Sequence, residues 1–431
     1  MPNKGWRAVR ALVFSVLASF ASTGTNAADL TVTGFGTIGY ARSDQDFRYL
    51  RYIDDGGTLK ADSLVGVQAE VQLNPQWGAT FQAVGGAPSG RDSGMDAQLR
   101  WAFVHFRPAN DWLFRVGRLR PPTFLHTQNS EVGVTYDQAR LPVEVYSLTP
   151  SFDFDGAAVT KTWELQGADV NLDAYWGKSK VKFRFFQRDA AQENYVPIKL
   201  ESKGLVLSYS TDSILLRGGV HQIDIERDDG QPFVSTFTPN PILAPFPPFP
   251  PLPPPLGGTL FLPSGSPSQL ESTVLTLGAD WRTGDWRITG EYARRKLKET
   301  KIGPDSNAAY VTVAHKFGKW TPYVTQAYLR STSDARALYQ SVNGTPVPLA
   351  VQTPPPFGPG LPANLHRILA DQMVVFDQYS TMLGASYSFS ATSKVKLEWM
   401  RTKVGLKSSL VDGDVHNKSF NVFSLSYSVA F

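Results

Sequence analysis

The sequence predicts an all-β chain that closes into a transmembrane antiparallel β-barrel of about sixteen strands, with short periplasmic turns and long extracellular loops. Three features predict this fold: an export segment at the N-terminus, a repeated two-residue alternation of apolar and polar side chains, and an alternation of short turns with long loops. The composition agrees, because 10 Trp, 16 Tyr and 26 Phe stand against only 5 Met in 431 residues.

The first 28 residues are expected to be a cleaved signal peptide. A basic start, MPNKGWRAVR, precedes an apolar run at residues 11–22 and a small-residue cleavage site after Ala27 or Ala28. The apolar run is shorter than the roughly 20 residues that a membrane-spanning helix needs. We therefore expect an exported mature chain, residues 29–431, without a transmembrane helix.

The formal net charge of +4 does not indicate an acidic partner. Lys4, Arg7 and Arg10 lie in the expected signal peptide, and without them 39 basic residues stand against 38 acidic ones. This balance excludes a generally basic nucleic-acid binder. The absence of cysteine excludes disulfides, thiol nucleophiles and thiolate metal sites.

The clearest alternation is SFNVFSLSYSVAF at residues 419–431, and similar patterns occur at 65–73, 286–292 and 379–389. Successive side chains of a strand point to opposite faces, so the segment 419–431 has one aromatic face and one face of small polar residues. Its apolar face consists of Phe423, Leu425, Tyr427, Val429 and Phe431.

Seven very short polar turns divide the chain, and longer polar or Pro-rich segments lie between them. Strands on both sides of each turn give an even number, with the short turns at one end, which is typical of an outer-membrane barrel. Hydrocarbon offers no hydrogen-bond partners, so such a sheet must close on itself. A basic and aromatic stretch at 181–188 would add a hairpin and make eighteen strands. The sixteen predicted strands are 29–44, 61–73, 77–87, 97–108, 112–120, 152–165, 169–178, 201–210, 214–226, 271–282, 285–297, 307–317, 320–331, 377–390, 393–405 and 419–431.

Six of the tryptophans flank the short turns and would lie at one level of the barrel. An indole ring is stable at the headgroup boundary, where its body faces lipid and its N–H faces water, so these residues are expected to form an aromatic girdle. They are Trp77, Trp112, Trp163, Trp281, Trp286 and Trp320.

Three long loops stand out. The loops 228–270 and 334–374 hold 13 and 7 of the 31 prolines, and we expect stiff, water-facing segments that stay out of any sheet; a ligand for proline-binding partners is the alternative. The loop 121–151 contains enough apolar side chains to pack, so it is expected to fold into the barrel and narrow it.

Charged residues on the polar faces are expected to line the narrowing. If the apolar face of each strand meets lipid, several basic and acidic wall residues point into the lumen, including Lys396, Glu70, Glu291 and Glu398. Opposed charges across a constriction select solutes by charge. The predicted constriction residues are Arg115, Arg120, Glu131, Asp137, Arg140, Glu144, Arg217 and Arg287.

No catalytic constellation is visible. The 6 histidines are scattered, none at metal-ligand spacing and none near a nucleophilic serine motif. We expect no enzyme activity, no cofactor and no metal.

These features resemble the Gram-negative porin family. The likeness rests on the signal peptide, the opening strand DLTVTGFGTIGYAR, the sixteen alternating segments, the long third loop and the C-terminal NVFSLSYSVAF. It implies a homotrimer of barrels in the lipid of the bacterial outer membrane, each with a water-filled pore that passes small hydrophilic solutes and ions by passive diffusion. It also implies that the outer-membrane assembly machinery reads Phe423, Leu425, Tyr427, Val429 and Phe431.

Two alternatives stay open. One is a substrate-specific channel with binding sites along the wall. The other is an adhesin or structural barrel with a closed lumen.

Overall fold

The computed structural model describes residues 29–148, 153–242, 257–352 and 360–431. The expected signal peptide lies outside these residues, as do the Pro-rich runs at 243–256 and 353–359. Among the described residues, no helix is long and apolar enough to cross a membrane.

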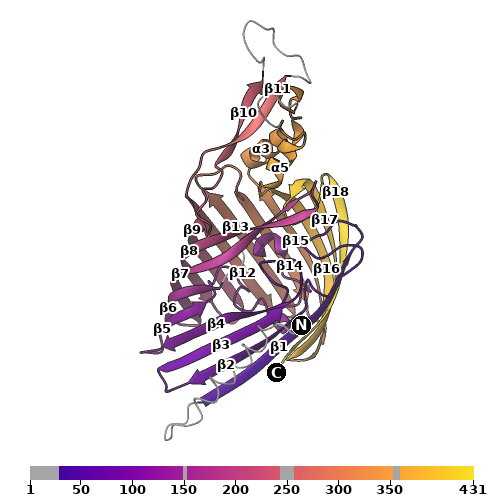
Figure 1. Ribbon diagram of the computed structural model, residues 1–431. Helices are drawn as coiled ribbons and strands as arrows, with labels where there is room; N and C mark the ends of the chain where they lie inside the picture. Colours follow the sequence, from indigo (N-terminus) through magenta and orange to yellow (C-terminus); the bar gives the residue numbers. More distant parts are fainter. Residues whose placement is uncertain (1–28, 149–152, 243–256, 353–359) are drawn as a thin grey trace, which may run out of the picture.

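Sixteen strands form one closed barrel, which confirms the predicted fold (Figure 1). Strands that follow one another pair antiparallel, β9 pairs with β12, and β1 closes the sheet against β18. The barrel strands are β1 (Asp29–Ser43), β2 (Leu64–Gln72), β3 (Trp77–Gly86), β4 (Asp96–Phe106), β5 (Trp112–Leu119), β6 (Phe154–Leu165), β7 (Ala168–Gln187), β8 (Gln192–Ser210), β9 (Ile214–Arg227), β12 (Gln269–Thr283), β13 (Trp286–Leu297), β14 (Ser306–His315), β15 (Trp320–Ser331), β16 (Phe376–Ser390), β17 (Ser393–Ser408) and β18 (Lys418–Ala430).

The stretch 181–188 adds no strand to the barrel, so the count of eighteen is wrong. Its residues lengthen β7, which pairs with β8 as far as Gln187 opposite Gln192. The neighbouring strands β6 and β9 stop earlier, at Asp155 and Arg227. The alternating pattern therefore made a longer hairpin and not a new one.

The alternation along β18 separates an outer from an inner face. Phe423 and Leu425 are 54% and 52% exposed, whereas Ser424 and Ser426 are 4% and 3% exposed. Each small serine faces inward and each large side chain faces outward, as the two-residue period of a strand requires. The six tryptophans beside the short turns also face outward, with exposures from 39% at Trp112 to 54% at Trp320.

The interior of the barrel is partly filled. Tyr49 and Ile53, from the β1–β2 loop, and Phe124 and Leu148, from the β5–β6 loop, belong to one buried apolar cluster with the inner faces of β12 to β18. Loops therefore cover one side of the inner wall.

The Pro-rich loops differ from the expectation of unpaired segments. Loop 228–270 contains a separate hairpin, β10 (Thr236–Ile242) and β11 (Gly258–Ser264), with Pro239 and Pro241 in its ladder. A two-stranded ribbon tolerates proline because every second backbone nitrogen points away from the partner strand, and these two prolines are two residues apart.

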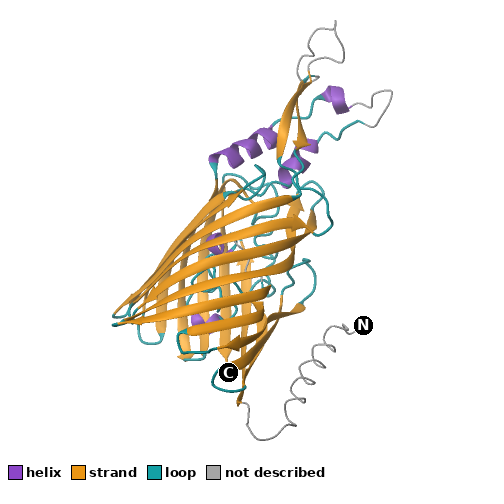
Figure 2. Cartoon of the chain, turned by 90° about the vertical axis from the view of Figure 1, so that its left-hand side faces the viewer, coloured by secondary structure: helices purple, strands orange, loops and turns teal. Residues whose placement is uncertain are grey.

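The hairpin packs on helices from the other Pro-rich loop. Phe237 and Phe261 share a buried core with Tyr339, Val342 and Leu369. Figure 2 shows the hairpin and these helices beyond one rim of the barrel, and we call them the knob. The helices are α3 (Ser333–Gly344), α4 (Leu349–Gln352) and α5 (Leu365–Asp371).

Candidate functional site

Loop 3, the connection between β5 and β6, folds into the barrel. The amide of Leu125 donates a hydrogen bond to Glu291 Oε2 (2.8 Å), and the amide of Ala139 donates to the Tyr323 hydroxyl (3.2 Å). Leu125 also fits against Gly278, where a Cβ atom would lie 2.9 Å from Leu125 Cγ. Loop 3 is therefore seated on the inner wall formed by β12, β13 and β15.

A buried ion cluster holds the root of loop 3. The Arg120 side chain is 2% exposed and pairs with Glu131 (2.9 Å) and with Asp153 (3.0 Å). Arg100, on β4, pairs with the same two carboxylates at 2.8 and 3.2 Å. Burial opposes the charge of Arg120, but Glu131 and Asp153 outweigh it and raise its pKa. Arg120 and Glu131 thus fix the loop and contribute little surface to the lumen.

Two further side chains tie loop 3 to other parts of the barrel. Asp137 pairs with Lys394 on β17 at 2.8 Å; burial opposes its ionisation, but Lys394, Ser386 and Arg287 together outweigh burial and lower its pKa. Arg140 forms a two-pronged contact with Asp62 of the β1–β2 loop, at 2.8 and 2.5 Å. Burial again opposes the charge, yet Asp62 raises the Arg140 pKa.

Glu144 lies away from the lumen water, in contrast to the constriction role expected for it. Its residue is 0% exposed on the short helix α2 (Val143–Tyr146). Oε1 accepts hydrogen bonds from Gln378 Nε2 (2.8 Å) and from the Ser380 hydroxyl, both on β16. Burial raises its pKa. The carboxyl group anchors α2 to the wall.

Arg115 and Arg217 lie on the wall that loop 3 leaves less covered. Arg115 Nη2, on β5, donates to Thr160 (2.8 Å) and lies 3.5 Å from Asp173 on β7. Arg217 Nη1, on β9, donates to the carbonyl of Phe124 in loop 3 (3.1 Å). The two guanidinium groups therefore lie on either side of the strand that carries Asp173.

In these wall pairs the basic partner is the more exposed one. The side chains of Arg115 and Asp173 are 23% and 15% exposed. Arg287, on β13, pairs with Asp280 at 2.8 Å, and their side chains are 23% and 8% exposed. In both pairs the arginine thus presents the larger exposed fraction to the lumen.

Arg118 has the opposite orientation. It forms a two-pronged contact with Asp155 at 2.8 and 2.7 Å, and the two side chains are 37% and 62% exposed. Val116 on the same face of β5 is 63% exposed. Arg118 therefore lies on the outside of the barrel, three residues from Arg115.

The β7–β8 hairpin continues beyond the barrel as a free two-stranded ribbon, residues 179–197, which we call the strap. Strand β6 pairs with β7 only as far as Lys178, and β9 pairs with β8 only as far as Ile198. The pairs between β7 and β8 continue to Gln187 and Gln192. The strap therefore leaves the wall and is supported by other contacts.

The strap reaches the opposite rim. Arg184 donates to both oxygens of Asp412 (2.7 and 2.6 Å), and Arg188 pairs with Asp414 (2.8 Å), both in the β17–β18 loop. In the barrel order, six strands separate β7 and β8 from β17 and β18 in either direction. The strap thus crosses the long-loop mouth of the barrel along a diameter (Figure 1).

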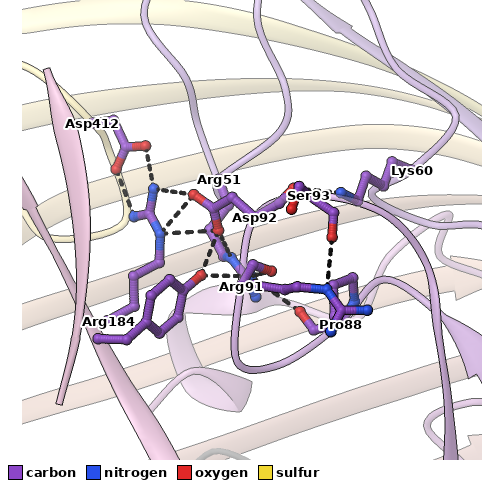
Figure 3. Close-up of polar contacts among 9 residues, drawn as sticks. Arg51, Lys60, Pro88, Arg91, Asp92, Ser93, Arg184 and Asp412 are labelled. Carbon is purple, nitrogen blue, oxygen red and sulfur yellow. Dashed lines mark hydrogen bonds and ion pairs between the residues drawn. The ribbon is translucent and has the colours of Figure 1, made fainter.

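Asp92 lies in the β3–β4 loop and joins the strap both to this loop and to Arg51 of the β1–β2 loop. It accepts hydrogen bonds from Arg184 (2.7 Å), from the Tyr195 hydroxyl (2.7 Å) and from Arg51 (2.8 Å). Figure 3 shows Arg184 between Asp92 and Asp412. Burial opposes ionisation of Asp92, but these hydrogen bonds outweigh it and lower the pKa.

Sequence reasoning missed the contacts of the strap and the partners that complete the ion pairs of loop 3 and the wall: Asp62, Arg100, Asp153, Asp173, Asp280 and Lys394. Asp173 and Asp280 occupy inward positions of β7 and β12, so the alternation alone contained a signal for them. In the part of the chain that the structure describes, no group of three His, Cys, Asp or Glu residues has an arrangement that would hold a metal ion.

No protein-family model matches the chain, and no curated protein does either. Solved structures share its fold at low sequence identity. The outer-membrane expressed OmpT of Vibrio cholerae is 13% identical, with 95% of this chain and 99% of that chain covered and a TM-score of 0.52. A loop L8 deletion mutant of the same protein is 15% identical, with 94% and 100% covered and a TM-score of 0.51.

Salmonella typhi OmpF, in a complex with daunomycin, is 11% identical, with 94% of this chain and 98% of that chain covered and a TM-score of 0.51. These identities support a statement about architecture alone. The chain therefore shares the sixteen-stranded barrel fold of these bacterial outer-membrane proteins.

Proposed function

We propose that this protein is a porin of the outer membrane, a water-filled channel through which small hydrophilic solutes and ions diffuse down their gradients. The observation that carries the proposal is that the outer face of the barrel wall is apolar whereas its inner face is polar. Large apolar side chains such as Leu425 face outward, whereas serines and ion pairs face inward around a loop tied across the lumen. No step of this function needs a cofactor or a covalent intermediate.

The charge preference of the channel follows from the exposed partners of the wall pairs. Arg115 and Arg287 present more surface than Asp173 and Asp280, so a permeating anion meets the basic groups first. We therefore infer that the channel favours anions, and that Arg115, Arg217 and Arg287 carry this preference.

The test is the reversal potential of purified protein in a planar bilayer with a salt gradient. Arg115→Glu should shift the reversal potential toward cation selectivity, and Arg118→Glu, on the outer face of the same strand, should leave it unchanged. Equal reversal potentials in wild type and Arg115→Glu would contradict the assignment of Arg115. The absence of any current steps would contradict the channel itself.

Three features of the proposal concern partners. A porin-type barrel is expected to be exported through the signal peptide 1–28. Its assembly machinery is expected to recognise the outward side chains of β18, and the folded barrel is expected to associate into a homotrimer. Native mass spectrometry in detergent tests the trimer. Phe431→Ala tests recognition, since it should reduce the amount of folded barrel in the outer membrane without changing the single-channel conductance.

The knob favours a second candidate, a surface-attachment protein. It has a core of its own beyond the rim, formed by residues such as Phe237, Phe261 and Tyr339, and ion diffusion does not require it. Deletion of residues 236–264 separates the two candidates, because a channel should retain its current steps and an adhesin should lose binding to its target surface.

A further inference from the structure

We propose that the strap is the extracellular gate of the channel, held closed by Arg184 where it binds Asp92 and Asp412. The inference rests on the proposed channel function. The closed state is the one described above, in which a ribbon crosses the mouth along a diameter. In the open state, the contacts of Arg184 part and the strap turns about its base at the rim.

The contacts at the far end of the strap form a compact latch. The Arg184 side chain is 13% exposed, and those of Asp92 and Asp412 are 9% and 5% exposed. Charges buried to this degree are screened little by salt, so they hold the ribbon at physiological ionic strength. One guanidinium therefore joins the strap to two loops of the opposite rim, β3–β4 and β17–β18, which only β1 and β2 separate in the barrel order.

A second set of contacts lies at the tip. Arg188 pairs with Asp371 of α5 at 2.8 Å and donates from its backbone amide to the same carboxylate at 3.0 Å. Asp189 accepts from Arg367 at 2.6 Å. These contacts connect the strap to the knob, so a displacement of the knob acts directly on the strap.

The loop that presents Arg51 to the latch is strained. Leu50 and Arg51 both have a left-handed backbone, with φ of 49° and 74°. Such conformations are unfavourable for residues with a side chain and persist where surrounding contacts impose them. Arg51 Nη2 donates to the Tyr195 hydroxyl of the strap (3.0 Å), and Arg51 Nε donates to Asp92 (2.8 Å). Backbone hydrogen bonds between Tyr49 and Ile53 close this turn, so Arg51 is presented to the latch by a fixed backbone.

The base of the strap is built as a hinge. Pro197 is the first residue of β8 beyond its last pair with β9; its carbonyl accepts from the Asp228 amide (2.9 Å), but it has no N–H to return a second hydrogen bond. On the β7 side, pairing with β6 ends at Lys178. Beyond these points the ribbon is held only by its own ladder and by the loops it touches, so a few backbone angles at the base allow it to swing.

The experiment uses the absence of cysteine from the chain. In the double variant Arg184→Cys with Asp412→Cys, the native latch is removed and a bis-methanethiosulfonate reagent replaces it, forming a disulfide with each cysteine and releasing methanesulfinate. Cross-linking should lower the single-channel conductance, and reduction should restore it. The matched control is Lys180→Cys with Asp228→Cys, which joins the strap to its own rim, where Lys180 lies 3.2 Å from Asp228. Cross-linking there should leave the conductance unchanged.

A second variant avoids any cross-linker. Arg184→Gln should lower the ratio of closed to open dwell times by about tenfold, the change that corresponds to about 1.4 kcal/mol. The gate is rejected if current flows but the Arg184→Cys/Asp412→Cys variant has the same conductance when cross-linked and when reduced, and Arg184→Gln has unchanged dwell times. A lack of current in every variant would overturn the channel function instead.

Discussion

Arg120→Ala should unseat loop 3 more than any single change at the surface of the barrel. The substitution removes a guanidinium whose side chain is 2% exposed and leaves Glu131 and Asp153 in the interior. Removal of one partner from a buried ion pair costs about 3–5 kcal/mol, because the other charge stays buried without compensation. Arg100 still pairs with both carboxylates, so we expect a loss of about 3 kcal/mol, the lower end of that range.

The matched control is Arg118→Ala. Arg118 lies two residues earlier, and its pair with Asp155 is exposed on the outside of the barrel, where such pairs contribute about 0–1 kcal/mol. Limited trypsin cleavage at Arg140, inside loop 3, reports how often the loop opens. A loss of about 3 kcal/mol corresponds to a rise of about a hundredfold in the open population.

The double variant Arg100→Ala with Arg120→Ala refines the test. It leaves Glu131 and Asp153 without either arginine, so its cost should exceed the sum of the two single costs by about 0.5–3 kcal/mol. The reasoning is refuted if Arg120→Ala is cleaved no faster than Arg118→Ala, since the cluster would then not hold the loop.

Three further changes test other parts of the structure. Glu144→Gln removes a carboxyl whose pKa is raised by burial. This carboxyl stabilises the folded state fully at pH values below its unfolded pKa, and the contribution is lost as the pH rises through its folded pKa. The melting temperature of wild type relative to the variant should therefore fall with rising pH, and a constant difference would contradict this assignment of Glu144. Gly278→Val places a Cβ 2.9 Å from Leu125 Cγ, so it should lower the free energy of unfolding by about 1–3 kcal/mol and enlarge the conductance. The control is Gly218→Val, whose Cβ would lie 3.5 Å from its nearest neighbour and which should change neither quantity. Leu425→Arg, on the outward face of β18, should cost up to about 2–4 kcal/mol in refolding into lipid vesicles, and an unchanged refolding midpoint would show that this face does not meet lipid.

The strands could be predicted because their signal is local. The alternation at 419–431 needs only neighbouring residues, and β18 spans Lys418–Ala430. The inward direction of Arg115 and Arg287 follows from the same parity. In contrast, Arg140 and Asp62 are 78 residues apart, and their contact depends on the path of loop 3 inside the barrel. No spacing in the sequence encodes that path.

The strap shows why a correct local signal gave a wrong count. Residues 181–187 do alternate and do form a strand, but the sequence does not reveal whether a hairpin joins the closed sheet or leaves it. That depends on where β6 and β9 stop pairing. The same reason applies to Pro239 and Pro241, since proline opposes a central strand but not a ribbon with two open edges.

The seam between β1 and β18 makes completion of the ring depend on its final segment. The Gly34 amide donates to the carbonyl of Phe431 (2.6 Å), and the Phe431 amide donates to the carbonyl of Gly34 (2.8 Å). A premature stop codon that removes β18 leaves both β1 and β17 with bare backbone, which invites aggregation and degradation. Only a chain whose synthesis has continued through β18 can therefore close its ring.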